Sequence, residues 1–118
     1  MTNQTNLDRV LELNRWVAEG RGLEALDEFY TEDVSMQENT LPPTVGREAN
    51  REREQAFFDS VAEWRKYEVV ESAAQGDVTF TETVMEFVLK DGTEVRMEQA
   101  TRARWRDGRI FDERFYHS

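Results

Sequence analysis

A chain of 118 residues is the size of one domain, residues 1–118, and leaves no room for a second. Its 25 acidic residues outnumber 15 basic ones and give a formal net charge of −10, which argues against nucleic acid or an anionic membrane as a partner because both are bound through clustered Lys and Arg. The absence of cysteine excludes disulfides, thiolate metal sites and thiol catalysis.

The N-terminal residues predict a helix and show no export signal. The first ten, MTNQTNLDRV, lack the basic flank and apolar stretch of a signal peptide, and no apolar run approaches the ~18 residues of a membrane span. We therefore expect a cytoplasmic protein. Thr5 or Asn6 is placed to cap a helix with regularly spaced apolar residues, and Gly20 and Gly22 end it.

The remainder of the first half predicts two more helices and one short strand. Apolar residues at helical spacing between Leu23 and Tyr30 indicate a short helix, and the alternation in residues 33–38 indicates a strand. Residues 39–46 contain two prolines and are expected to form a loop. A third helix is predicted for residues 47–64, with Phe57 and Trp64 on its apolar face and Glu54 in its solvated part.

The second half predicts four strands joined by tight turns. The strands are residues 66–75, 78–90, 93–106 and 109–117, and each junction carries Gly-Asp or Asp-Gly. Helices followed by an antiparallel meander make an α+β fold, in which the helices of the N-terminal half wrap one face of a curved, mainly antiparallel sheet.

Strand 93–106 shows which face of the sheet is covered by the helices. Apolar residues alternate with four arginines and a glutamate, so the apolar set is expected to face inward: Val95, Met97, Ala103 and Trp105. Gln99 and Thr101 share that face and interrupt it with polar groups. Buried polar groups need partners, so these two either pair with a neighbouring strand or water, or line a cavity.

The register of strand 78–90 depends on the turn at Asp91-Gly92, because a slip of one residue turns every side chain to the opposite face. A two-residue turn places Glu82 opposite Thr101 and puts Val78, Phe80, Glu82, Val84, Glu86 and Val88 inside. A three-residue turn with a glycine bulge brings in Met85, Phe87 and Leu89 instead. We favour the two-residue turn, because the other puts three threonines inside.

The last hairpin allows two arrangements that the residues alone do not separate. A three-residue turn at Arg106-Asp107-Gly108 places Glu113 opposite Thr101 and His117 opposite Met97, and makes the inner set Phe111, Glu113, Phe115 and His117. A two-residue turn makes the inner set Ile110, Asp112, Arg114 and Tyr116.

The whole arrangement resembles the nuclear transport factor 2-like superfamily, in particular its SnoaL-like branch of polyketide cyclases and uncharacterised proteins. The resemblance covers nearly the whole chain, and its most specific pieces are LEALDEFYTEDV and WRDGRIFDERFY. It implies a cone-shaped sheet wrapped by helices, a pocket at the open end, and a homodimer formed through the sheet. It also favours the inward register of Glu113 and His117, since cyclases of this family place an acid/base residue at the position of Glu113.

Ketosteroid isomerase belongs to the same superfamily. It uses a carboxylate as its base, and a Tyr and a protonated Asp as hydrogen-bond donors to the oxyanion. The resemblance places the base on Glu38, the Tyr on Asn14 and the Asp on Thr101. Both strong donors are absent, which argues against that isomerase reaction. Related epoxide hydrolases use an Asp–Arg–Asp set. Glu82 and Arg114 could imitate it only if the last hairpin had the register that points Arg114 inward, which we do not favour.

Three residues are the candidates for acid/base catalysis. Glu38 is expected at the rim of the pocket with Met36 and Trp105 as apolar neighbours that raise its pKa, and Glu113 is expected inside. His117 is the only histidine, and histidine is the residue type whose ordinary pKa lies near neutral pH. The expected lining residues are Asn14, Met36, Phe57, Met97, Gln99, Thr101, Trp105 and Phe115. We expect no metal and no cofactor, because lone carboxylates with one histidine do not make a metal site.

Two classes of function fit these residues. The first is an isomerase, cyclase or lyase that transfers protons on a small, mostly apolar molecule in the cone. The second is a non-catalytic ligand-binding or dimeric interaction module with the same cavity, because fold does not fix function. Convergence of two or more of the candidate groups within hydrogen-bond reach would favour the enzyme.

Overall fold

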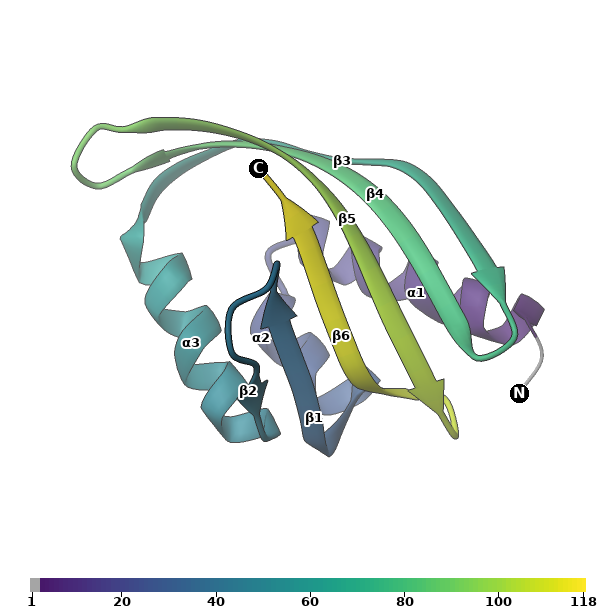
Figure 1. Ribbon diagram of the computed structural model, residues 1–118. Coiled ribbons are helices and arrows are strands. Elements are labelled where there is room, and N and C mark those ends of the chain that lie inside the picture. The colour runs from purple at the N-terminus through teal and green to yellow at the C-terminus, as the bar shows by residue number, and fades with distance from the viewer. Residues whose placement is uncertain (1–2) are drawn as a thin grey trace.

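The computed structural model describes residues 3–118, in which three helices cover the concave side of one six-stranded sheet (Figure 1). The helices are α1 (Asn3–Ala18), α2 (Gly22–Phe29) and α3 (Arg47–Ser60). The strands are β1 (Tyr30–Glu38), β2 (Thr44–Val45), β3 (Val61–Gln75), β4 (Val78–Leu89), β5 (Glu94–Arg106) and β6 (Arg109–His117). They follow the order β2-β1-β6-β5-β4-β3, and all neighbours are antiparallel except β1 and β6. The predicted α+β class is confirmed.

The first helix begins earlier than predicted. It starts at Asn3, so the proposed caps Thr5 and Asn6 both lie inside it. Asn6 is fully buried and its amide donates a 3.3 Å hydrogen bond to the carbonyl of Gly76. Its polar side chain is thus used in a contact with the β3–β4 turn, which sequence spacing does not show. The predicted end is correct, and Gly20 adopts a φ of 82°.

The third helix ends earlier than predicted, at Ser60, and the chain continues directly as a strand (Figure 1). Val61 is already extended and pairs with Leu89, and Trp64 pairs with Phe87. Pairing with β4 therefore overrides the helical spacing of these residues. Tyr30 likewise belongs to β1 and not to the second helix, and the predicted loop contains the short strand β2.

The predicted register between β4 and β5 is wrong by one residue. The loop has three residues, with Gly92 at a φ of 91° and the amide of Leu89 bonded to the carbonyl of Thr93 at 2.9 Å. Thr81 therefore pairs with Thr101, and Thr83 with Gln99. The residues predicted inside face outward: Val78, Phe80, Glu82, Val84, Glu86 and Val88.

Three threonines are accordingly buried on the inner face, which had been the reason to reject this register. Thr79 accepts a 2.9 Å hydrogen bond from the indole N–H of Trp105, and Thr81 bonds the hydroxyl of Ser72 at 3.2 Å. A paired hydroxyl is inexpensive to bury. The partners of Thr79 and Thr81 come from other strands, so the sequence of β4 alone overestimates the cost of burying these two residues.

The last hairpin combines features of both predicted arrangements. Its turn has two residues, Asp107 and Gly108, at φ of 52° and 79°, and it places Ile110 inside opposite Trp105. The register then shifts by one residue at Phe111, which has no partner in the ladder. This β-bulge turns the following residues over, so that Glu113, Phe115 and His117 point inward.

The bulge also changes the predicted pairings along β6. Glu113 lies opposite Ala103 and not Thr101, and His117 lies opposite Gln99 and not Met97. Phe111, predicted inside, instead lies under the guanidinium of Arg106 at 4.9 Å. The inward direction of Glu113 was thus predicted, but its position along the strand was not.

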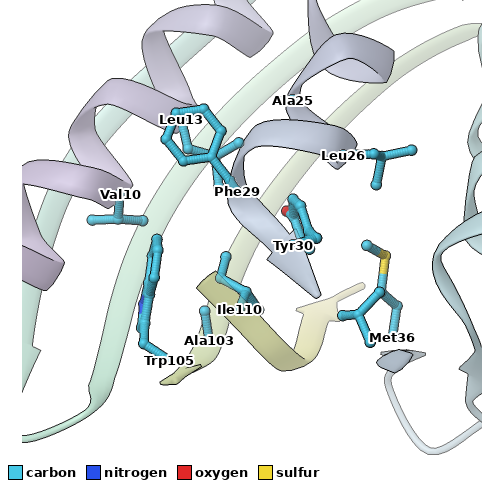
Figure 2. Packing of buried hydrophobic residues seen from close by; sticks show 11 residues of the cluster. Val10, Leu13, Ala25, Leu26, Phe29, Tyr30, Met36, Ala103, Trp105 and Ile110 are labelled. Atoms are coloured by element: carbon cyan, nitrogen blue, oxygen red, sulfur yellow. The ribbon is translucent and has the colours of Figure 1, made fainter. Parts of the chain in front are cut away.

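The hydrophobic core lies between α1, α2 and the β1–β6–β5 part of the sheet (Figure 2). Ala103 and Trp105 are buried in it, whereas Arg104 and Arg106 on the other face are exposed, which confirms the predicted alternation of β5. The other core residues are Val10, Leu13, Ala25, Leu26, Phe29, Tyr30, Val34, Met36 and Ile110.

The outer face of the sheet differs from expectation. In the favoured register Met85, Phe87 and Leu89 would point outward and form an apolar patch for the expected dimer, but Met85 and Phe87 are buried on the inner side. Two aromatic residues are exposed there instead, Phe80 at 49% and Tyr116 at 43%. None of the helices in the described part of the chain has the length and apolar character needed to cross a membrane.

Candidate functional site

A cavity of about 1100 Å³ lies between the inner face of the sheet and helices α1 and α3. Its walls are mostly apolar, and they include Phe57 and Trp64. The rings of these two residues pack edge-to-face or tilted against each other and against Phe87, with centroids 5.1 to 6.0 Å apart. Phe57 and Trp64 are both more than one third exposed. The cavity therefore has an apolar body and an aromatic edge that solvent reaches.

Six of the predicted lining residues border this cavity: Asn14, Phe57, Met97, Gln99, Thr101 and Phe115. The other two do not. Trp105 is in the core, and Met36 is buried with its sulfur 3.2 Å from Arg53. Gln99 and Thr101 fit both interpretations of their polarity, since they line the cavity and also contact each other at 3.4 Å.

Glu113 is the most deeply buried acid of the cavity, with 3% of its surface exposed. The hydroxyl of Tyr30 lies 2.9 and 3.1 Å from its two oxygens and donates to the carboxyl group. Burial raises the pKa of Glu113 to about 8; the Tyr30 hydrogen bond opposes this, and nearby Glu54 reinforces it. At neutral pH this carboxyl group is therefore mostly protonated.

Glu54 also faces the cavity, although it was predicted in the solvated part of its helix. Only 22% of its side chain is exposed, and its carboxylate lies 3.9 Å from Arg53. Removal from water raises the pKa of Glu54 to about 7, while the cations Arg53 and Arg51 oppose this and the charge of Glu38 adds to it. Glu54, Glu38 and Glu113 are thus close enough to influence one another.

Glu38 and His117 meet at the end of β1 and β6. His117 Nε2 lies 2.9 Å from Glu38 Oε2, and Arg53 Nη1 lies 3.3 Å from the other oxygen of Glu38. Both side chains line the cavity and stay partly exposed. The predicted apolar surroundings of Glu38 are therefore wrong in part: its neighbours are a histidine and an arginine, and Trp105 is not among them.

His117, the last residue of β6 and the second-to-last of the sequence, is held in place by hydrogen bonds. The backbone amide of His117 donates a 2.9 Å hydrogen bond to the side chain of Asn39, and Arg114 Nε donates to the carbonyl of Asn39. Asn39 adopts a φ of 50°, a conformation that asparagine tolerates better than most residues. These contacts fix His117 beside Glu38.

Sequence reasoning missed several polar residues of the site: Tyr30, Arg53, Glu54, Tyr67 and Thr83. Tyr67 of β3 donates a 3.4 Å hydrogen bond to Asn14 Oδ1, and burial together with the charge of Glu113 raises the pKa of its hydroxyl. A usable signal was present only on α3, where Asn50, Arg53, Glu54 and Phe57 follow helical spacing on one face. Tyr67 and Thr83 required the strand register.

The arrangement is suited to proton transfer. It joins a buried carboxyl group that is largely neutral at pH 7 with a tyrosine donor and, nearby, a carboxylate–histidine pair. Within residues 3–118 no three acidic or histidine side chains are grouped so as to hold a metal ion. Glu82 is exposed, and neither it nor Arg114 lines the cavity, so they do not form an acid–arginine set there.

Comparison with known proteins identifies this architecture. The family model of the SnoaL-like domain matches residues 8–113. A proposed SnoaL-like polyketide cyclase from Mesorhizobium loti superposes with a TM-score of 0.82 at 21% identity, covering 98% of this chain and 99% of that one. None of the curated proteins shows significant similarity to this sequence.

Two further solved structures have the same fold. A nuclear transport factor 2-like protein of unknown function from Burkholderia pseudomallei gives a TM-score of 0.84 at 15% identity, covering 100% and 92% of the two chains. An LEH-like epoxide hydrolase from Mycobacterium tuberculosis gives 0.80 at 14% identity, covering 98% and 84%. At such identities the likeness establishes the fold alone.

Proposed function

This chain belongs to the SnoaL-like domain family, and we propose that it binds a small, mostly apolar molecule in its cavity and transfers a proton on it, as an isomerase, cyclase or lyase does. The observation that carries the proposal is Glu113, buried in the cavity wall with Tyr30 bonded to both of its oxygens and a pKa of about 8. A titratable group tuned toward neutral pH inside a pocket is the pattern of a general acid or base.

The proposed step is a proton transfer within one ligand. Glu113 in its carboxylate form takes a proton from a carbon next to a carbonyl group, and the resulting carboxylic acid returns a proton to another atom of the same ligand. Atoms and charge are balanced, and Glu113 ends as it began. Tyr30 stabilises the charged carboxylate through its hydrogen bond, and Glu38 with His117 offers a second site for a proton.

The step is testable without the natural substrate. 2-Tetralone, an uncharged two-ring ketone, exchanges the protons next to its carbonyl for deuterium in D₂O when a base removes them. Proton NMR should show faster exchange with the wild-type protein than with Glu113→Gln, by about tenfold or more, since general base catalysis contributes ~10² or more. Glu98→Gln removes an exposed carboxylate of β5 and should exchange like wild type.

A non-catalytic binding protein is the second candidate. Asn14 and Thr101 occupy positions that, in the resembled isomerase, carry strong oxyanion donors, and the cavity walls are apolar enough to bind without reaction. Equal exchange with wild type, Glu113→Gln and buffer would contradict the enzyme and favour this second candidate. Mass spectrometry of any molecule released on denaturing the purified protein would then identify the ligand.

A further inference from the structure

Glu54 of α3 is a carboxyl group of the cavity wall that the proposed proton transfer does not use. Its side chain is 22% exposed, and within residues 3–118 no hydrogen bond reaches either of its oxygens. In the same part of the chain its only ion pair is a long one, 3.9 Å to Arg53. Burial removes water from this carboxyl group without supplying a full replacement, so its oxygens are available to a molecule in the cavity.

The two other acids considered for this cavity are already engaged. The hydroxyl of Tyr30 contacts both oxygens of Glu113, and Glu38 contacts His117 with one oxygen and Arg53 with the other. A carboxylate oxygen has a second lone pair, so Glu113 can still take up a proton. Glu54 alone of the three has both oxygens free of hydrogen bonds from the described residues, and it is the best placed to donate to a ligand.

Helix α3 carries Glu54 to the part of the sheet that holds Glu113. The guanidinium of Arg53, the preceding residue, lies with Nη2 3.2 Å from the sulfur of Met36 and with its carbon 6.0 Å from the ring centroid of Phe115. Met36 pairs with Glu113 in the ladder, and Phe115 is the next inward residue after Glu113 on β6. The charge of Glu54 also raises the pKa of Glu113. The two carboxyl groups therefore border the same part of the cavity from different elements.

The charged groups around Glu54 act in opposite directions. Arg53 and Arg51 on its own helix favour its charged form, whereas Glu38 of β1 favours the neutral form. Removal from water outweighs the cations and raises the pKa of Glu54 to about 7, so near neutral pH a large share of the molecules carry a proton there. The other titratable side chains that line the cavity from the surrounding elements are Glu24, Tyr30, Arg65, Lys66, Tyr67, Glu113 and His117.

We propose that Glu54 is a second catalytic residue of the cavity and donates a proton to the ligand oxygen while Glu113 removes one from the neighbouring carbon. This rests on the proposed function and adds a general acid to its general base. The C–H bond breaks and its electron pair forms the C=C bond of an enol, while the pair of the C=O π bond forms the new O–H bond. Glu54 becomes charged and Glu113 neutral, and the reverse step restores both.

Deuterium exchange of 2-tetralone, corrected for the rate in buffer, tests this role. Glu54→Gln should lower the exchange rate at pH 7 by about tenfold or more, since general acid–base catalysis contributes ~10² or more. A purely electrostatic role predicts the opposite direction. Removing the charge of Glu54 lowers the pKa of Glu113 and so leaves more of the base ionised at pH 7.

The pH profile between pH 5 and 9 gives a second readout. The wild-type rate should be highest between pH 7 and 8, because the step needs one proton shared between Glu54 and Glu113, whose pKa values are about 7 and about 8. Glu54→Gln should lose the fall on the alkaline side and keep only the rise caused by ionisation of Glu113. Glu54→Asp keeps a carboxyl group and should retain the alkaline fall.

Glu52→Gln, an exposed change on the same helix and outside the cavity wall, is the matched control and should keep the wild-type rate and profile. Glu54→Gln removes a charge that burial disfavours, so it should fold like wild type. An unchanged or higher rate in Glu54→Gln, or an alkaline fall that it keeps, would overturn the role of Glu54 and leave Glu113 as the base. Equal rates for wild type and Glu113→Gln would overturn the proposed function itself.

Discussion

The hydroxyl of Tyr30 lies 2.9 Å from one oxygen of Glu113 and 3.1 Å from the other, although 83 positions separate the two residues in the chain. Tyr30 is the first residue of β1, and Glu113 lies on the parallel strand β6. Both side chains are fully enclosed by the protein. This hydrogen bond favours the charged carboxylate more than the nearby charge of Arg53 does, so the protonation of Glu113 is tied to the pairing of β1 with β6.

Replacing Tyr30 by phenylalanine should raise the pKa of Glu113 further above about 8. The hydrogen bond from Tyr30 favours the charged form, so its loss leaves burial less opposed. An NMR titration of the side-chain carboxyl carbon measures this directly. Tyr67→Phe is the control, because Tyr67 bonds to Asn14 and not to Glu113. An unchanged or lower pKa in Tyr30→Phe would contradict the assigned role.

The free energy of unfolding should fall as pH rises from about 4.5 to about 8 because of Glu113. Its pKa is near 8 in the folded protein and near 4.5 when exposed, so over this range the folded state holds a proton that the unfolded state has lost. One proton corresponds to at most about 1.4 kcal/mol per pH unit. Urea unfolding between pH 5 and 8 measures the slope.

Glu113→Gln should make that slope smaller, since the amide does not titrate, while Glu54 with its pKa raised to about 7 still contributes a slope of the same sign. Glu98→Gln, on the exposed face of β5, should keep the wild-type slope and so account for the general effect of the net charge of −10. Identical slopes for wild type and Glu113→Gln would mean that Glu113 ionises in the folded protein as easily as in the unfolded chain.

Asn50→Ala should destabilise the fold by about 2–4 kcal/mol, because several buried hydrogen bonds are lost at once. The amide of this fully buried residue donates to the carbonyls of Gly46 at 2.9 Å and Thr44 at 3.0 Å, and lies 3.4 Å from that of Val34. Through these contacts Asn50 holds α3 against β1 and β2. Chemical denaturation of the variant gives the value.

Glu52→Ala, an exposed change on the same helix, is the matched control and should alter the free energy of unfolding by no more than about 0.5 kcal/mol. If Asn50→Ala behaved like this control, the hydrogen bonds of Asn50 would contribute nothing net to the fold.

Dimerisation through the outer face of the sheet remains our expectation, now for a different set of residues. Phe80 and Tyr116 are exposed there among charged side chains, and exposed aromatic residues on a sheet face are typical of a partner surface. Light scattering at tens of micromolar should report a dimer for wild type and mostly monomer for Phe80→Glu. Leu41→Glu, in the exposed loop after β1, should stay dimeric. A wild-type monomer at this concentration would refute the proposal.

The α+β class, the number of helices and the inward face of β5 could be predicted from the sequence alone. They follow from local periodicity, turn residues and composition, all of which act over a few neighbouring positions. The alternation of arginines with Ala103 and Trp105 is the clearest example, since burying the arginine face would be prohibitively costly. The family resemblance rests on two segments of the sequence, LEALDEFYTEDV and WRDGRIFDERFY.

Which polar residues meet could be learned only from the folded chain. The three-residue loop at Gly92 set the face of Thr83, the bulge at Phe111 set that of Glu113, and the early end of α3 released Trp64 into a strand. Each depends on what the neighbouring strand presents, and a change of one residue reverses a whole face. For that reason the partners Tyr30 and Glu113, 83 positions apart, are visible only in the folded chain.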